Sequence, residues 1–144
     1  MRAWLKRKLV FPTLLLPLAV ASCNRQEAPP APVHGRVFYK GLPLVGGSIV
    51  FAPNPEKGGQ GPLARADIQG DGSYVLQSGD RPGAVPGWHR VSVVCVETPP
   101  GQQFSGRFPE VHPLVPLRYS VPEMSGLEGH VLPEQDNAID FHLD

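Results

Sequence analysis

Glycine and proline interrupt this sequence so often that a long helix cannot form after the first 22 residues. The 144 residues include 16 glycines and 18 prolines. Beyond residue 22, no window of eleven residues keeps an uninterrupted apolar period of 3.6. Proline removes a backbone donor and clashes with the preceding helical turn, and glycine loses much conformational freedom on folding. A helical domain is therefore excluded, and short strands separated by turns remain.

Alternating apolar and polar residues predict the positions of these strands. The expected strands are residues 34–40, 47–53, 63–69, 73–78, 88–96, 127–132 and 138–143. In the second strand, Ile49 and Phe51 are expected on the inner face. The turn signal Gly70-Asp71-Gly72 predicts that the third and fourth strands form a hairpin, with Tyr74 on its core face.

The fifth strand is the clearest, because it is rich in β-branched residues and alternates Val91, Val93 and Cys95 with polar residues such as Ser92. We expect it at the centre of a sheet. Residues 97–122 contain six prolines and are predicted to form an excursion without a regular ladder. Seven short strands with turns between them predict an all-β fold, a seven-stranded antiparallel sandwich of two sheets.

Short motifs at the turns and strand starts carry a family resemblance. They are Gly35-Arg36-Val37, Gly41-Leu42-Pro43-Leu44, Gly46-Gly47-Ser48-Ile49-Val50, Asp71-Gly72-Ser73-Tyr74-Val75-Leu76 and Pro86-Gly87-Trp88-His89-Arg90-Val91-Ser92-Val93. Together they resemble the carboxypeptidase regulatory-like, transthyretin-like domains of small bacterial lipoproteins. The resemblance implies a prealbumin-like Greek key that serves as a folding module, adhesion spacer or accessory unit. The family usually has an aromatic residue where His89 stands.

The N-terminal segment is typical of a lipoprotein signal. Residues 2–8 carry four basic side chains, residues 9–20 are almost entirely apolar, and small residues precede Cys23. The apolar run is too short and too interrupted by proline to span a bilayer. By resemblance to lipoprotein precursors, cleavage falls before Cys23, whose thiol takes a diacylglyceryl group. The alternative is an ordinary secretory signal in which Cys23 is incidental.

Three segments follow from this assignment. Residues 1–22 are the signal peptide, residues 23–32 a lipid-anchored, proline-rich linker, and residues 33–144 one domain. We expect the protein to be exported and lipid-anchored to the bacterial cell envelope, at the periplasmic face or the cell surface.

Removing the signal leaves 9 basic against 13 acidic side chains. Such a domain has no electrostatic attraction for phosphate backbones, so nucleic acid is not an expected partner.

Catalytic, metal and cofactor motifs are lacking in the sequence. It has no Gly-x-Ser-x-Gly elbow, His-Glu-x-x-His pair or phosphate-binding loop. His130 and His142 could hold a metal if the last two strands pair, but no third ligand is placed by local spacing. Asp71, with Asp67 and Asp80, could bind calcium, although Asp71 is better explained as a turn residue. We therefore expect no enzyme, no cofactor and no metal.

Cys95 is predicted to be an inert thiol, because alternation places it on the inner face of the fifth strand.

With no catalytic motif in the sequence, two non-catalytic functions remain. The first is a non-catalytic module of the cell envelope that binds a protein partner or acts as a spacer.

The second is carbohydrate binding, which needs exposed aromatic rings. The candidates are Trp88, Phe104, Phe108 and Tyr119. The simpler interpretation, which we favour, is that these rings hold the proline-rich excursion against the sandwich.

Overall fold

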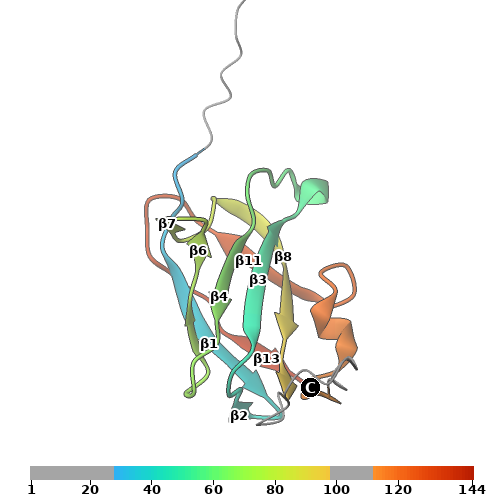
Figure 1. Ribbon diagram of the computed structural model, residues 1–144. Helices are drawn as coiled ribbons and strands as arrows, with labels where there is room; N and C mark the ends of the chain where they lie inside the picture. The colour runs from blue at the N-terminus through green and yellow to red at the C-terminus, as the bar shows by residue number, and fades with distance from the viewer. Residues whose placement is uncertain (1–27, 98–111) are drawn as a thin grey trace, which may run out of the picture.

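The computed structural model describes residues 28–97 and 112–144, and over these residues the fold is all-β, without an α-helix (Figure 1). The strands are β1 Val33–Tyr39, β2 Leu42–Pro43, β3 Ser48–Pro53, β4 Ala64–Asp67, β5 Ser73–Val75, β6 Gln77–Ser78, β7 Arg81–Pro82, β8 Gly87–Val94, β9 Val96–Glu97, β10 His112–Pro113, β11 Leu127–Val131, β12 Asn137–Ala138 and β13 Phe141–Leu143. Two short 3-10 turns complete the elements, η1 at Pro55–Lys57 and η2 at Leu117–Ser120. The predicted all-β class is confirmed, and several expected strands are divided into shorter ones.

The larger sheet has six strands in the order β11-β8-β3-β4-β6-β7. β8 lies between β3 and β11, so its predicted place inside a sheet is confirmed. Ile49 and Phe51 of β3 are fully buried, as are Val91 and Val93 of β8. The period-2 pattern predicted these inner faces because successive strand residues point to opposite sides of a sheet.

The smaller sheet is built around β1. β12 and β13 pair with one edge of β1 in parallel, and β2 and β5 pair with it in antiparallel orientation. The expectation of purely antiparallel sheets is therefore wrong at the C-terminal strand. Ile139, in the segment that connects β12 to β13, lies close to Gly35 of β1. A Cβ added to Gly35 would lie only 1.8 Å from the Ile139 carbonyl oxygen. Glycine is required at this position because any side chain would collide with that backbone.

The two sheets face each other around one core, which gives a sandwich-like arrangement. Phe51 from the larger sheet packs edge-on against Phe141 from the smaller one, with ring centroids 5.8 Å apart. Tyr74 joins them at 6.3 Å from Phe51. The buried apolar residues form one continuous cluster drawn from both sheets, which is what a two-layer domain requires.

The expected strand 73–78 is divided, and its two halves belong to different sheets. β5 pairs with β1, whereas β6 pairs with β4 through Arg65 and Gln77. Tyr74 lies at the centre of β5, is 1% exposed, and donates its hydroxyl to the Ile139 carbonyl at 2.6 Å. Its hydroxyl therefore ties β5 to the smaller sheet.

The excursion after β8 contains a short ladder, contrary to our expectation. β9 and β10 pair Val96 with Pro113 and Glu97 with His112, which is possible because Pro113 needs no donor in a two-residue ladder. Tyr119 of η2 is 4% exposed, and its hydroxyl accepts hydrogen bonds from Arg118 and from the backbone of Asp144. This ring is held in the core.

No helix among the described residues is long and apolar enough to cross a membrane.

The described chain enters at the end of the sandwich that carries β6 and β7, and its C-terminus lies at the opposite end (Figure 1). Ala31 and Ala84 form an antiparallel bridge there, with reciprocal N–H to C=O bonds of 2.9 and 3.0 Å. An added Cβ on the neighbouring Gly83 would lie 2.0 Å from the Ala31 carbonyl oxygen. The chain is thus fixed to the sandwich two residues before β1 begins.

Candidate functional site

The predicted lipid-attachment residue, Cys23, lies outside the described residues, as do Phe104 and Phe108. The second cysteine, Cys95, is 2% exposed, and its Sγ lies 3.8 Å from the Val45 carbonyl oxygen. Burial raises the pKa of this thiol, which disfavours the reactive thiolate. The prediction that Cys95 faces inward is confirmed.

The two histidines considered for a metal site are separated by the topology. β11, which carries His130, pairs with β8, and β13, which carries His142, pairs with β1. The supposed pairing of these last two strands is therefore wrong. Each imidazole instead stacks on a neighbouring ring, His130 on Trp88 at 4.4 Å and His142 on Phe38 at 4.8 Å.

Of the three aspartates considered for calcium, Asp71 is explained by turn geometry. Asp71 accepts hydrogen bonds from the hydroxyl of Ser73 at 2.6 Å and from its backbone N–H at 3.0 Å. These two bonds, the hydroxyl first, lower the pKa of Asp71, as expected for a turn aspartate. Within residues 28–97 and 112–144, no group of three or more His, Cys, Asp and Glu side chains is placed to hold a metal ion.

Trp88 lies on the outer face of the larger sheet, where its side chain is 36% exposed. Besides the stacked His130, the Lys57 ammonium of η1 lies 4.2 Å from the ring centroid. Lys57 also contacts the Glu128 carboxylate at 2.6 Å. These partners belong to β11 and η1, so the described contacts of Trp88 hold η1 on the sheet. A sugar platform needs a free ring face. On Trp88, the His130 imidazole stacks on the ring and the Lys57 ammonium lies over it.

His89 is a buried polar residue of β8 for which the sequence predicted no functional role. It is 1% exposed, its Nδ1 lies 3.1 Å from the Gly87 carbonyl oxygen, and its ring centroid lies 5.7 Å from that of Phe51. Nε2 is buried without a hydrogen-bond partner. Burial lowers the pKa of His89, and His130 adds to this effect while the Gly87 carbonyl opposes it.

A depression of about 940 Å³ lies where β5 leaves β4. The hairpin register places Asp67 opposite Val75, because Arg65 pairs with Gln77 on one side and the Gln69 N–H donates to the Ser73 carbonyl on the other. Among the described strand pairings, however, Val75 is paired with His34 of β1 and not with Asp67. The hairpin is therefore closed at both ends and open at its middle rung.

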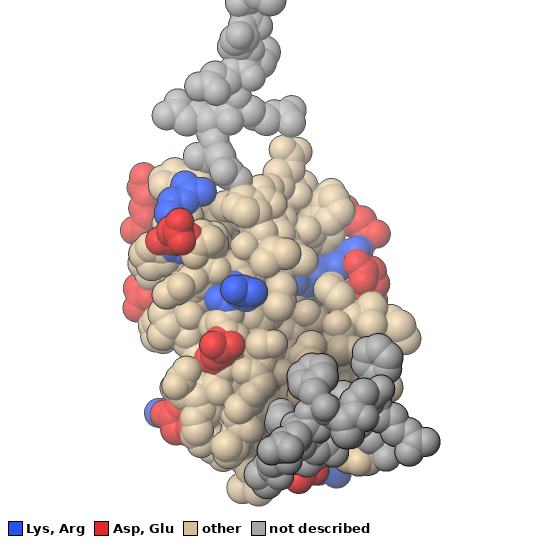
Figure 2. Space-filling model, viewed as in Figure 1, with Lys and Arg blue, Asp and Glu red and all other residues tan. Residues whose placement is uncertain are grey.

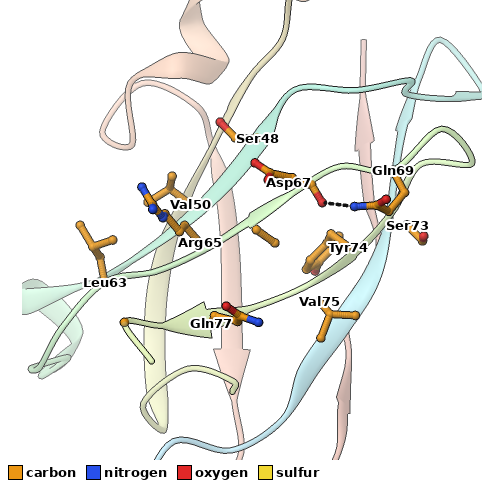
Figure 3. A pocket seen from close by; sticks show the side chains of 12 residues that line it. Ser48, Val50, Leu63, Arg65, Asp67, Gln69, Ser73, Tyr74, Val75 and Gln77 are labelled. Atoms are coloured by element: carbon orange, nitrogen blue, oxygen red, sulfur yellow. Dashed lines mark hydrogen bonds between the residues drawn. The ribbon is translucent and has the colours of Figure 1, made fainter. Parts of the chain in front are cut away.

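The lining of this depression mixes charged, amide, hydroxyl and aliphatic groups. In Figure 3, Val50, Leu63 and Arg65 lie on one flank, Ser73, Tyr74 and Val75 lie on the other, and Asp67 and Gln77 lie between them. Leu63 and Val75 are 53% and 65% exposed. The sequence could not predict this site, because the depression forms where β5 pairs with β1 of the smaller sheet while β6 pairs with β4 of the larger sheet. The sequence did predict that Tyr74 faces inward, and the hydroxyl of this residue bonds to Ile139 on the side of the smaller sheet.

Charges are interspersed on the face shown in Figure 2, with basic and acidic side chains scattered among neutral ones. The visible face therefore has no stripe of one sign. Comparison of the chain with protein-family models, curated proteins and solved structures finds no match.

Proposed function

We propose that this protein is a non-catalytic lipoprotein of the bacterial cell envelope, whose domain is a binding or spacer module with the carboxypeptidase regulatory-like, transthyretin-like fold. The observation that carries the proposal is Cys23, which directly follows a basic, then apolar, then small-residue segment. The facing of two sheets around one core agrees with the sandwich that the resemblance implies. The finer part of the proposal is that the strands form a seven-stranded, prealbumin-like Greek key.

Lipid attachment at Cys23 would hold the domain close to the bilayer. Ala31, the first residue that the structure ties to the sandwich, lies only eight positions after Cys23. Eight residues reach at most about 28 Å when fully extended. The end that carries β6 and β7 would then face the membrane, and the end that carries the C-terminus would face away (Figure 1).

Replacing the cysteines one at a time tests the anchor. Cys23→Ala should abolish incorporation of labelled palmitate and move the protein from the detergent phase to the aqueous phase, because two acyl chains are what stable anchoring needs. Cys95→Ala is the matched control, since it also removes a thiol but leaves the proposed acylation site. If Cys23→Ala still incorporates palmitate or still partitions with membranes, the proposal is wrong.

Carbohydrate binding, the alternative function, has less support. Tyr119 is buried, Trp88 carries a stacked imidazole and an ammonium, and Phe104 and Phe108 lie outside the described residues. None of the aromatic candidates that the structure describes offers a free platform, so a protein partner is the better-supported ligand for a binding module.

A further inference from the structure

We propose that the depression over the open rung binds an extended peptide segment of a partner protein, with an acidic side chain at Arg65 and a basic side chain at Asp67. The proposal rests on the proposed function, because it specifies the ligand of the binding module. Three features of the depression support it: main-chain groups without a ladder partner, two unpaired charges of opposite sign, and the lack of an exposed aromatic ring.

The main-chain argument follows from the alternation of hydrogen-bond directions along a strand. The N–H of Leu76, directly after β5, donates to the Val33 carbonyl of β1, whereas the Ser73 carbonyl of β5 accepts from the Gln69 N–H on the β4 side. The N–H and C=O groups of Val75, two residues after Ser73, therefore also point toward β4. The partner that faces them in the register, Asp67, is not paired with them. A peptide main chain carries a donor and an acceptor that can pair with the Val75 N–H and C=O groups, whereas the Asp67 carbonyl already accepts from the Gln69 side-chain amide at 3.3 Å.

The charge argument concerns two side chains of β4. Arg65 and Asp67 are two residues apart on one strand, so both project from the outer face, about 7 Å apart. Both are exposed, and neither forms an ion pair with any described residue. The other charged pairs of this sheet are satisfied locally, for example Arg90 with Glu56 at 2.6 Å. Arg65 and Asp67 are thus available for a ligand that carries both signs at the spacing of an extended chain.

The composition of the lining favours a peptide over a sugar. Tyr74 is the only aromatic residue that lines the depression, and it is 1% exposed with its hydroxyl bonded to Ile139. Sugar rings bind on exposed aromatic faces, whereas Val50, Leu63 and Val75 offer aliphatic contacts suited to β-branched peptide side chains.

Binding of short labelled peptides to the full-length protein in nonionic detergent tests the inference. The probes are three fluorescein-labelled, threonine- and valine-rich heptapeptides that carry at positions 3 and 5 one glutamate and one lysine, two glutamates, or two lysines. The mixed-charge peptide should bind about tenfold more tightly than the other two, measured by fluorescence polarisation. The mixed-charge peptide is prepared in both orders and the tighter of the two is compared, because for a given strand direction only one order places glutamate at Arg65 and lysine at Asp67.

Charge reversals in the protein should move the preference predictably. Asp67→Arg should make the two-glutamate peptide the tightest ligand, and Arg65→Glu should do the same for the two-lysine peptide. Asp136→Arg, an exposed reversal away from the depression, should leave the mixed-charge preference unchanged. Circular dichroism confirms that each variant is folded before binding is compared.

Failure of this inference is distinguishable from failure of the lipoprotein proposal. No saturable binding of any peptide up to about 1 mM, a value weaker than specific recognition normally gives, would overturn the peptide site. Equal affinity for all three peptides, or an unchanged preference in Asp67→Arg, would overturn it as well. Neither result affects palmitate labelling of Cys23, and loss of labelling in turn leaves peptide binding to be judged by itself.

Discussion

Replacing His89 by leucine should stabilise the protein, because the imidazole carries a buried nitrogen without a partner. An unsatisfied buried polar atom costs about 1–3 kcal/mol. Leucine has a similar volume, and it gives up the Nδ1 contact with the Gly87 carbonyl at 3.1 Å, which contributes about 1 kcal/mol. The free energy of unfolding at pH 7.5 should therefore rise by about 1 kcal/mol, measured by urea unfolding followed by circular dichroism.

The gain should widen in mild acid. Burial lowers the pKa of His89 in the folded state, whereas the unfolded chain takes up a proton below about pH 6.5. The unfolded state therefore binds more protons below this pH, and the wild-type protein loses stability until the pH reaches the lower folded pKa. For an imidazole that stays neutral when folded, the loss between pH 7.5 and 5.5 reaches at most about 1.4 kcal/mol.

A second histidine variant is the matched control for the loss of an imidazole. His142→Leu also removes one imidazole, but from an exposed position on β13. It should not raise the free energy of unfolding at pH 7.5, because the unpaired buried nitrogen of His89 is still present. The reasoning about His89 is refuted if His89→Leu is less stable than wild type at pH 7.5, or if its advantage does not grow between pH 7.5 and 5.5.

Two further substitutions test the inner and outer faces of β8. Val93→Asp should unfold the domain, because an unpaired charge in the core costs several kcal/mol. Val94→Asp, at a position that is 38% exposed, should change the urea midpoint little. Similar urea midpoints for the two variants would contradict the predicted alternation of inner and outer faces. Trp88→Ala should lower the melting temperature, since it removes the ring that His130 and Lys57 contact, and should leave retention on polysaccharide columns unchanged. Loss of retention with unchanged stability would favour the carbohydrate-binding alternative.

Sequence patterns identified the inner faces of strands better than their partners. Ile49, Phe51, Val91 and Val93 are fully buried as expected, because the period-2 pattern is local and records which side of a strand faces the core. One exception is Ser92, which alternation points outward although it is only 5% exposed. η2 packs against β8, and a contact of this kind is set by distant residues.

Strand pairing was harder to predict because it depends on residues far apart in the sequence. The turn at Gly70-Asp71-Gly72 is consistent with a continuous hairpin. The contacts that join β5 to the smaller sheet, such as the hydrogen bond from Tyr74 to Ile139, 65 residues later, connect residues far apart in the sequence. For the same reason, neither the parallel placement of β13 nor the depression at Asp67 and Val75 could be read from the sequence. Cys23 differs, because a signal segment is recognised locally, and its assignment remains a prediction.

The position of β1 also determines how the domain would respond to mechanical load. β1 is the central strand of its sheet, with β12 and β13 along one edge and β2 and β5 along the other. A pulling force applied N-terminal to Ala31 would first open the Ala31–Ala84 bridge and would then act along the axis of β1. The ladders on both edges would be loaded in shear, so that many backbone hydrogen bonds resist together rather than opening one at a time. A domain tethered through its N-terminus in this way would resist unravelling beyond the Ala31–Ala84 bridge.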